Sequence, residues 1–137
     1  MKTNIRINAN LEELATLRHH IIEFAKTNKI NDLNTELIVL SIDEICTNLI
    51  KYAYTNNVNN KIIIVTLELL SNKLTITIQD TTKPFDIRNH KDSRNNTKKI
   101  TPGGLGIHIV KMTMDEIDYQ QKTENNPLNI LTLIKYL

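Results

Sequence analysis

All three glycines of this 137-residue chain lie within four consecutive positions, in the segment GGLG that contains Gly103, Gly104 and Gly106. Elsewhere the chain must turn without the residue that tolerates positive φ most readily. This concentration indicates a special backbone geometry at one place. The apolar run that follows, to Met114, predicts a helix, and glycines leading into a helix let backbone N–H groups approach an anion such as phosphate.

Hydrophobic periodicity predicts the elements on either side of that turn. Alternating apolar residues predict strands at Thr3–Ala9, Ile62–Leu70, Leu74–Gln79, Ile117–Gln121 and Asn129–Tyr136. Helical spacing predicts helices over about residues 10–27, 34–54 and 103–114. The order predicts an α/β (α+β) two-layer sandwich, with helices covering one face of a mostly antiparallel mixed sheet.

Local signals predict two of the connections. Ser71–Lys73 separates two β-rich runs and predicts a hairpin. Asn34 is the expected N-cap of the second helix, with Glu36 in its first turn.

The bulk composition indicates one ordinary domain over residues 1–137, with 40% hydrophobic and 23% charged residues. A net charge of +2, from 17 basic and 15 acidic residues, is too balanced to indicate nucleic acid or a membrane surface. The N-terminus resembles no secretory signal, and Cys46 is a single cysteine expected in the core. We therefore expect a cytoplasmic protein with no direct nucleic-acid or membrane contact.

The second helix is apolar around most of its circumference but carries a polar stripe. Ser41, Glu44, Asn48 and Lys51 are spaced three or four residues apart, so they stack on one face. A buried carboxylate is costly unless it is compensated, and a ligand-lined cavity would compensate it. The alternative is a solvent-exposed edge of an ordinary core helix.

Asp80 follows the strand LTITIQ, where a carboxylate at the strand end could accept a hydrogen bond from the exocyclic amine of adenine. The alternative is an ordinary turn residue. Pro84 and Phe85 could then cover an apolar surface under the base. The following segment, Arg88–Lys99, carries five basic residues and one acidic residue, and it is either a loop that closes over phosphates or a solvated loop.

Three segments, in this order, resemble the N, G1 and G2 boxes of the GHKL ATPase superfamily: DEICTNLIKYAY, QDTTKPFD and GGLGIHIVKMTMDEIDY. More narrowly, the chain resembles anti-sigma-factor serine/threonine kinases over almost its whole length. The resemblance implies a Bergerat-type, histidine kinase-like ATPase domain that uses ATP and Mg²⁺. It also implies a homodimer that binds a sigma factor and phosphorylates an anti-anti-sigma partner with a STAS domain.

The resemblance also implies individual roles. Asn48 would coordinate Mg²⁺, Glu44 would be the general base for a partner's hydroxyl or for water, and Asp80 would recognise adenine. Lys98 or Lys99 would neutralise developing charge. Further nucleotide contacts are implied for Lys51, Thr82, Phe85, Gly103, Gly104, Leu105, Gly106, Ile107 and Thr132.

Two residues depart from the family's pattern. Thr82 stands where glycine is usual, and a turn requiring positive φ there would cost about 1–3 kcal/mol and reduce nucleotide affinity. Tyr52 stands where histidine is often found. Thr82 favours an alternative function, a nucleotide-gated binding module that sequesters a regulatory partner without kinase activity. A sensor histidine kinase would need a dimerisation helix with a phospho-accepting histidine, which we do not expect here.

Overall fold

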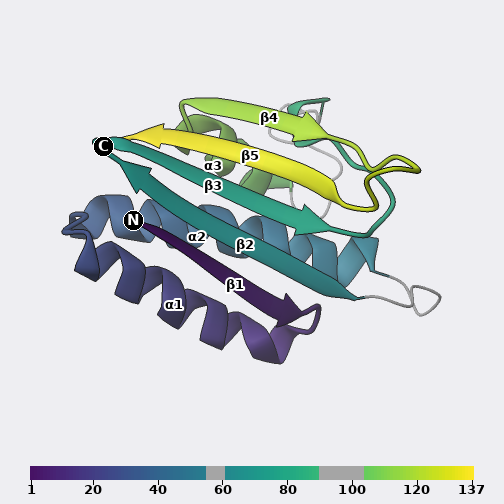
Figure 1. The fold of residues 1–137 in the computed structure, drawn as a ribbon, viewed down its shortest axis with the longest axis horizontal. Coiled ribbons are helices and arrows are strands. Elements are labelled where there is room, and N and C mark those ends of the chain that lie inside the picture. The colour runs from purple at the N-terminus through teal and green to yellow at the C-terminus, as the bar shows by residue number, and fades with distance from the viewer. Residues whose placement is uncertain (55–60, 90–103) are drawn as a thin grey trace.

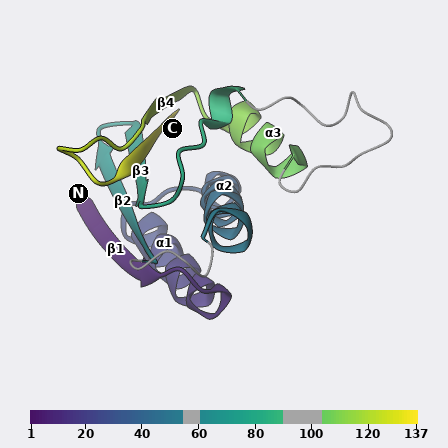
Figure 2. The same ribbon diagram turned by 90° about the vertical axis from the view of Figure 1, so that its right-hand side faces the viewer.

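The computed structural model describes residues 1–54, 61–89 and 104–137. Their strands form one sheet in the order β1-β2-β3-β5-β4, with bounds β1 Lys2–Asn8, β2 Ile62–Leu70, β3 Lys73–Asp80, β4 Glu116–Gln120 and β5 Asn129–Tyr136. The long helices, α1 Leu14–Thr27, α2 Asp32–Asn48 and α3 Gly104–Thr113, all lie on one face of it (Figures 1 and 2). The predicted two-layer α+β sandwich is confirmed. No helix in the described ranges is long and apolar enough to cross a membrane.

The sheet is antiparallel at each pairing of the described strands, rather than mixed. β3 and β4 do run in the same direction, with α3 between them in the sequence. However, β5 lies between them in the sheet and is antiparallel to both. In the described sheet, strands that run in the same direction therefore do not hydrogen-bond to each other.

Strict alternation in the central strands creates the face that the helices cover. In β2 and β3 the inward residues are 0% exposed, and these are Ile63, Val65, Leu67, Leu74, Ile76 and Ile78. From α1 and α2, Leu17, Ile21, Ile38 and Ile42 pack into the same core. Cys46 also lies there, and burial raises the pKa of its thiol. The predicted β2–β3 hairpin is confirmed, and its turn places Ser71 at a φ of 55°.

The start of α2 differs from the predicted one. Asn31, not Asn34, is the N-cap, and its side-chain oxygen accepts a hydrogen bond from the backbone N–H of Asn34 at 2.8 Å. Asn34 is thus the residue whose N–H is capped. The first apolar residue of the helix, Leu33, is 66% exposed, so the buried periodicity that suggested Asn34 begins later than the helix itself.

The end of this helical segment is also different. The α-helix ends at Asn48, and Leu49–Ala53 forms a π-helical turn, η2, in which the N–H of Tyr54 donates to the carbonyl of Leu49 at 2.8 Å. The Tyr54 hydroxyl donates to the carbonyl of Ile62 and accepts from the N–H of Thr81 at 3.1 Å. The wider turn is thereby anchored to the start of β2 and to the segment after β3.

The N-cap can be tested with two matched substitutions. We expect Asn31→Ala to lower the free energy of unfolding by about 1 kcal/mol, because a helix N–H loses its partner. Asn34→Ala should be neutral or slightly stabilising, because alanine has the higher helix propensity. Urea denaturation of both variants checks this, and the reverse ranking would contradict the assignment.

Candidate functional site

A cavity of about 760 Å³ opens between the C-terminal end of α2, the segment after β3 and the first turns of α3. Its volume lies in the range of small-molecule binding sites. Apolar and aromatic side chains form most of its wall, while Asn48, Asp80 and Lys83 add an amide and two charges. The described lining residues are Ile45, Asn48, Leu49, Tyr52, Ala53, Ile78, Asp80, Lys83, Pro84, Phe85, Ile87, Ile107, Tyr119 and Leu131.

Asp80, the last residue of β3, brings a carboxylate to this cavity and is only 5% exposed. Its Oδ1 accepts hydrogen bonds from the N–H of Thr82 at 2.9 Å, the hydroxyl of Thr82 at 2.6 Å and Nδ2 of Asn129 at 2.9 Å. Within the described residues no hydrogen bond reaches Oδ2. One oxygen is therefore held by the protein, and the other is left to accept a hydrogen bond from a ligand.

Asn129 is a site residue that the sequence analysis missed. It is 0% exposed at the start of β5, directly opposite Asp80 in the strand register. Its Nδ2 donates to Asp80 and to the carbonyl of Thr82, and its Oδ1 accepts from the N–H of Lys122. Only the register of two distant strands brings these residues together, so no local sequence signal pointed to it.

Thr82 does not show the strain that a positive φ would cause. Among the described non-glycine residues, positive φ occurs at Lys29 and Ser71. The Thr82 side chain is 2% exposed and donates its hydroxyl to Asp80. The condition for a strained turn is therefore not met, and threonine supplies a hydrogen bond that glycine cannot.

The polar stripe of α2 divides into buried and exposed parts. Asn48 lines the cavity, and its Nδ2 donates to Oε1 of the half-buried Glu44 at 3.2 Å. Ser41 is 0% exposed, and its hydroxyl has no hydrogen-bond partner within the described residues. Lys51 is exposed. The solvent-edge alternative therefore applies to Lys51, while Glu44 and Asn48 lie beside the cavity and the neighbouring helix.

At Gly106, α3 lies close to Glu44 of α2. A Cβ at Gly106 would lie 1.8 Å from Cδ and 2.0 Å from Oε1 of Glu44, so only glycine leaves room for this carboxylate. As predicted, the glycine-rich segment leads into a helix, which begins at Gly104. The backbone of α3 and the Glu44–Asn48 pair therefore lie against each other.

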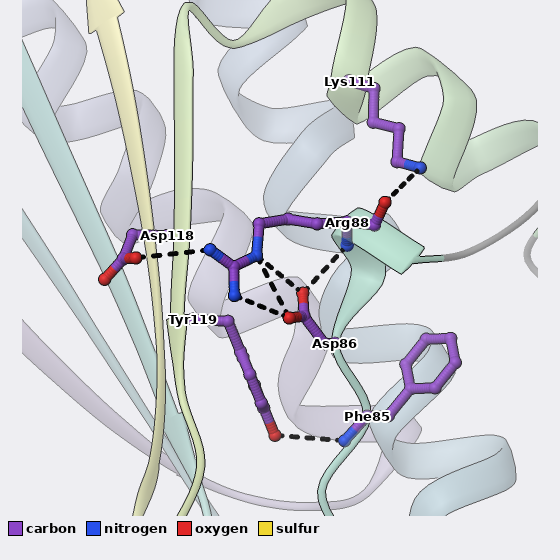
Figure 3. Close-up of polar contacts among 6 residues, drawn as sticks. All are labelled: Phe85, Asp86, Arg88, Lys111, Asp118 and Tyr119. Carbon is purple, nitrogen blue, oxygen red and sulfur yellow. Dashed lines mark hydrogen bonds and ion pairs between the residues drawn. The ribbon is translucent and has the colours of Figure 1, made fainter.

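Two of the aromatic residues that line the cavity, Phe85 and Tyr119, are joined by a hydrogen bond. The backbone N–H of Phe85 donates to the hydroxyl of Tyr119 at 3.0 Å, which joins the segment after β3 to β4 (Figure 3). Burial raises the pKa of Tyr119 above its usual range, so the hydroxyl stays protonated at neutral pH. Pro84 and Phe85 line the cavity, as expected for residues that cover an apolar surface.

Ion pairs of Arg88 connect the short helix η3, Ile87–Asn89, to β4. Its guanidinium lies between Asp86, at 2.7 Å, and Asp118, at 3.4 Å (Figure 3). The Arg88 hydrogen bond lowers the pKa of Asp86. The Nζ of Lys111 donates to the Arg88 carbonyl, which connects α3 to η3 as well. Arg88, the first residue of the predicted basic loop, is therefore paired with two carboxylates of the protein, those of Asp86 and Asp118.

Residues 7–135 match the family model described as the histidine kinase-like ATPase domain. The chain belongs to this family. The serine-protein kinase RsbW of Staphylococcus aureus strain MSSA476 is 33% identical over 84 residues, covering 57% of this chain and 53% of the relative. Another RsbW from Staphylococcus aureus is 30% identical over 104 residues, covering 72% and 63%. The chain thus spans little more than half the length of these relatives.

Solved structures share the fold of this histidine kinase-like ATPase domain. The RsbU and RsbW domains of a Mycobacterium tuberculosis protein match with a TM-score of 0.71 at 16% identity, over 100% of this chain and 32% of that one. The SiaB–SiaC complex from Pseudomonas aeruginosa matches at 0.68 and 10% identity, over 98% and 89%. The family resemblance predicted from the three motifs is confirmed.

Apart from Gly104 and Leu105, the residues predicted to act in this histidine kinase-like ATPase domain fall into three groups. Asn48, Asp80, Phe85 and Ile107 line the cavity. A second group supports the lining residues: Glu44 accepts a hydrogen bond from Asn48, Thr82 donates one to Asp80, and Gly106 lies against Glu44. The third group has two parts. The described residues Lys51 and Thr132 do not line the cavity, and Gly103, Lys98 and Lys99 lie outside the described residues.

Thr132 lies away from the cavity because strand alternation points it elsewhere. It pairs with Thr77 and Asp118 and alternates with the buried Leu131 and Leu133, which face the helices. Its neighbour Leu131 lines the cavity instead. Gly104 and Leu105 belong to the first turn of α3, whereas Gly103, Lys98 and Lys99 fall outside the described residues.

In this histidine kinase-like ATPase domain, the contact between Gly106 and Glu44 predicts that substitutions at these two positions have strongly coupled effects on stability. Alanine normally stabilises a helix by up to about 1 kcal/mol relative to glycine. We expect Gly106→Ala to destabilise the wild type by about 1–3 kcal/mol, since the new methyl group must displace Glu44. In a Glu44→Ala background the same substitution should be stabilising. A double-mutant cycle by chemical denaturation checks this, and equal effects in both backgrounds would exclude the contact.

Proposed function

We propose that this domain binds ATP with Mg²⁺ in the cavity and transfers a phosphoryl group to a serine or threonine of a partner protein, acting as a cytoplasmic anti-sigma factor. The observation that carries the proposal is Asp80. Its carboxylate is held by one oxygen at an apolar cavity whose opposite wall carries Asn48, hydrogen-bonded to Glu44. Asp80 as a buried acceptor that lines the cavity, together with Asn48, which also lines it and hydrogen-bonds to Glu44, supports nucleotide binding here.

The described side chains fit an adenine ring. Ile78, Ile107 and Leu131 give flat apolar contact, and Asp80 offers one carboxylate oxygen to an exocyclic amine. A mostly apolar pocket with a single placed polar group both buries a base and fixes its orientation. Phosphates would then extend toward the first turn of α3, where helix N–H groups and the helix dipole favour negative charge.

Asn48 fits a magnesium ligand. Its Nδ2 donates to Glu44, which leaves its amide oxygen as the atom available to a cation. Mg²⁺ requires few protein ligands, because phosphate oxygens and water complete its octahedral shell. When bound, Mg·ATP would supply the phosphoryl group.

Glu44 fits a general base. It is half-buried, and its carboxylate is located on one side by Asn48 and on the other by the backbone of Gly106. A positioned carboxylate can accept the proton of an attacking hydroxyl, from a partner's serine or threonine or from water. The tight contact with Gly106 keeps this carboxylate at the start of α3.

The relatives named serine-protein kinase RsbW support a protein substrate. On this basis we propose a homodimer that binds a sigma factor and phosphorylates an anti-anti-sigma protein with a STAS domain. The alternative, a nucleotide-gated module that only sequesters its partner, was favoured by strain at Thr82. Since Thr82 holds Asp80 without positive φ, that feature no longer favours it.

Two substitutions separate binding from transfer. We expect Glu44→Gln to bind Mg·ATP nearly as well as wild type but to lose about 10²- to 10⁴-fold in phosphotransfer, since the base is absent. Asn48→Ala should lose the Mg²⁺-dependent part of nucleotide binding. Calorimetry with and without Mg²⁺ and a phosphotransfer assay check both. Glu36→Gln, an exposed change of the same type on α2, is the control.

The acceptor is tested with labelled ATP and candidate STAS-domain proteins from the same genome. We expect one of them to be labelled on serine or threonine by wild type and not by Glu44→Gln. Binding of Mg·ATP without labelling of any candidate would support the sequestration module. If the domain does not bind Mg·ATP at millimolar concentration, both the kinase and the nucleotide-gated module are excluded.

A further inference from the structure

Three hydrogen bonds converge on one oxygen of Asp80 at the base of the cavity. Thr82 provides two of them, through its N–H at 2.9 Å and its hydroxyl at 2.6 Å, and Asn129 provides the third at 2.9 Å. Hydrogen bonds to a charged acceptor are stronger than those between neutral groups. The Oδ1 atom is therefore saturated by the protein, and a ligand can reach Oδ2.

The amide of Asn129 has one orientation that satisfies its surroundings. Nδ2 donates to Asp80 Oδ1 and to the carbonyl of Thr82, while Oδ1 accepts from the N–H of Lys122 at 2.9 Å. If the amide were turned over, its oxygen would face two acceptors. Because Asn129 is 0% exposed, that mismatch would leave buried polar groups unpaired. The network thus keeps donors directed at Asp80.

The segment after β3 is held from a second side as well. Lys122 donates twice: its backbone N–H to Oδ1 of Asn129, and its Nζ to the carbonyl of Thr81 at 3.0 Å. The start of β5 and the residues following β3 therefore form one connected unit. This unit holds Oδ1 of Asp80, a residue that lines the cavity.

We propose that Thr82 and Asn129 are positioning residues that set the base selectivity of the nucleotide cavity. By holding Oδ1 they present Oδ2 as a fixed acceptor, which favours a purine with an amino group at position 6 over one with an oxo group there. An oxo group would place an acceptor against an acceptor, and a buried site rejects such a pair strongly. This inference rests on the proposed nucleotide site and assigns a role to the threonine that replaces the expected glycine.

The test compares ATP with inosine triphosphate, which carries an oxo group at position 6. Thr82→Val removes the hydroxyl and keeps the β-branched shape. We expect it to weaken Mg·ATP binding by about 10-fold and Mg·ITP binding by less than about 2-fold, so that the preference for ATP falls. Thr82→Ser should restore the preference. Thr77→Val, on the opposite face of the sheet, is the matched control and should change neither affinity.

The outcomes distinguish this inference from the proposed function. Equal weakening of both nucleotides by Thr82→Val, or no change in either, overturns the selectivity role while nucleotide binding stands. If wild type binds neither nucleotide, the proposed function fails and the inference with it. Thr82→Gly, which also lacks the hydroxyl, provides a second route should valine disturb the fold. It should lower the ATP preference too, and an increased preference would overturn the inference.

Discussion

The pairing of β3 with β5 is the interaction on which the candidate site depends. It places Asp80 directly opposite Asn129, although 49 residues separate them in the chain. The same register directs Ile78 and Leu131 toward the helices, where both line the cavity. A slip of one residue would turn the apolar face outward and separate the carboxylate from its donor. Burial of the core and positioning of Asp80 are therefore enforced together.

The helix α2 joins the core to the other side of the cavity. Ile38 and Ile42 are at most 2% exposed against the sheet, while Glu44 and Asn48 lie toward α3 and the cavity. The absence of a side chain at Gly106 lets the two helices meet around the Glu44 carboxylate. Asp80 and Asn48 face one cavity because both of the elements that carry them are fixed by the same packed layer.

Much of this arrangement could be predicted from local patterns. The bounds of β2 and β5 match the prediction, and those of β3 agree within one residue at each end, because alternation over a half-buried surface is a strong signal. The start of α2 at Asp32, with Asn31 as its N-cap, was missed, since an exposed first turn carries no apolar periodicity. The π-helical turn was missed because its hydrogen bond to Tyr54 depends on contacts with β2 and the segment after β3. Asn129 and the true orientation of Thr132 required the strand register.

By itself the sequence determined the order of strands and helices, the amphipathic faces, and the residue types available for chemistry: Glu44 and Asn48 one turn apart, Asp80 at a strand end, and glycines at a helix start. These features depend on residues near one another in the chain. The tertiary structure decided which residue supports the carboxylate, and that the hydroxyl of Thr82 binds Asp80 rather than straining the turn. Such contacts arise only when register and packing join distant segments, because a hydrogen bond depends on distance and direction in space.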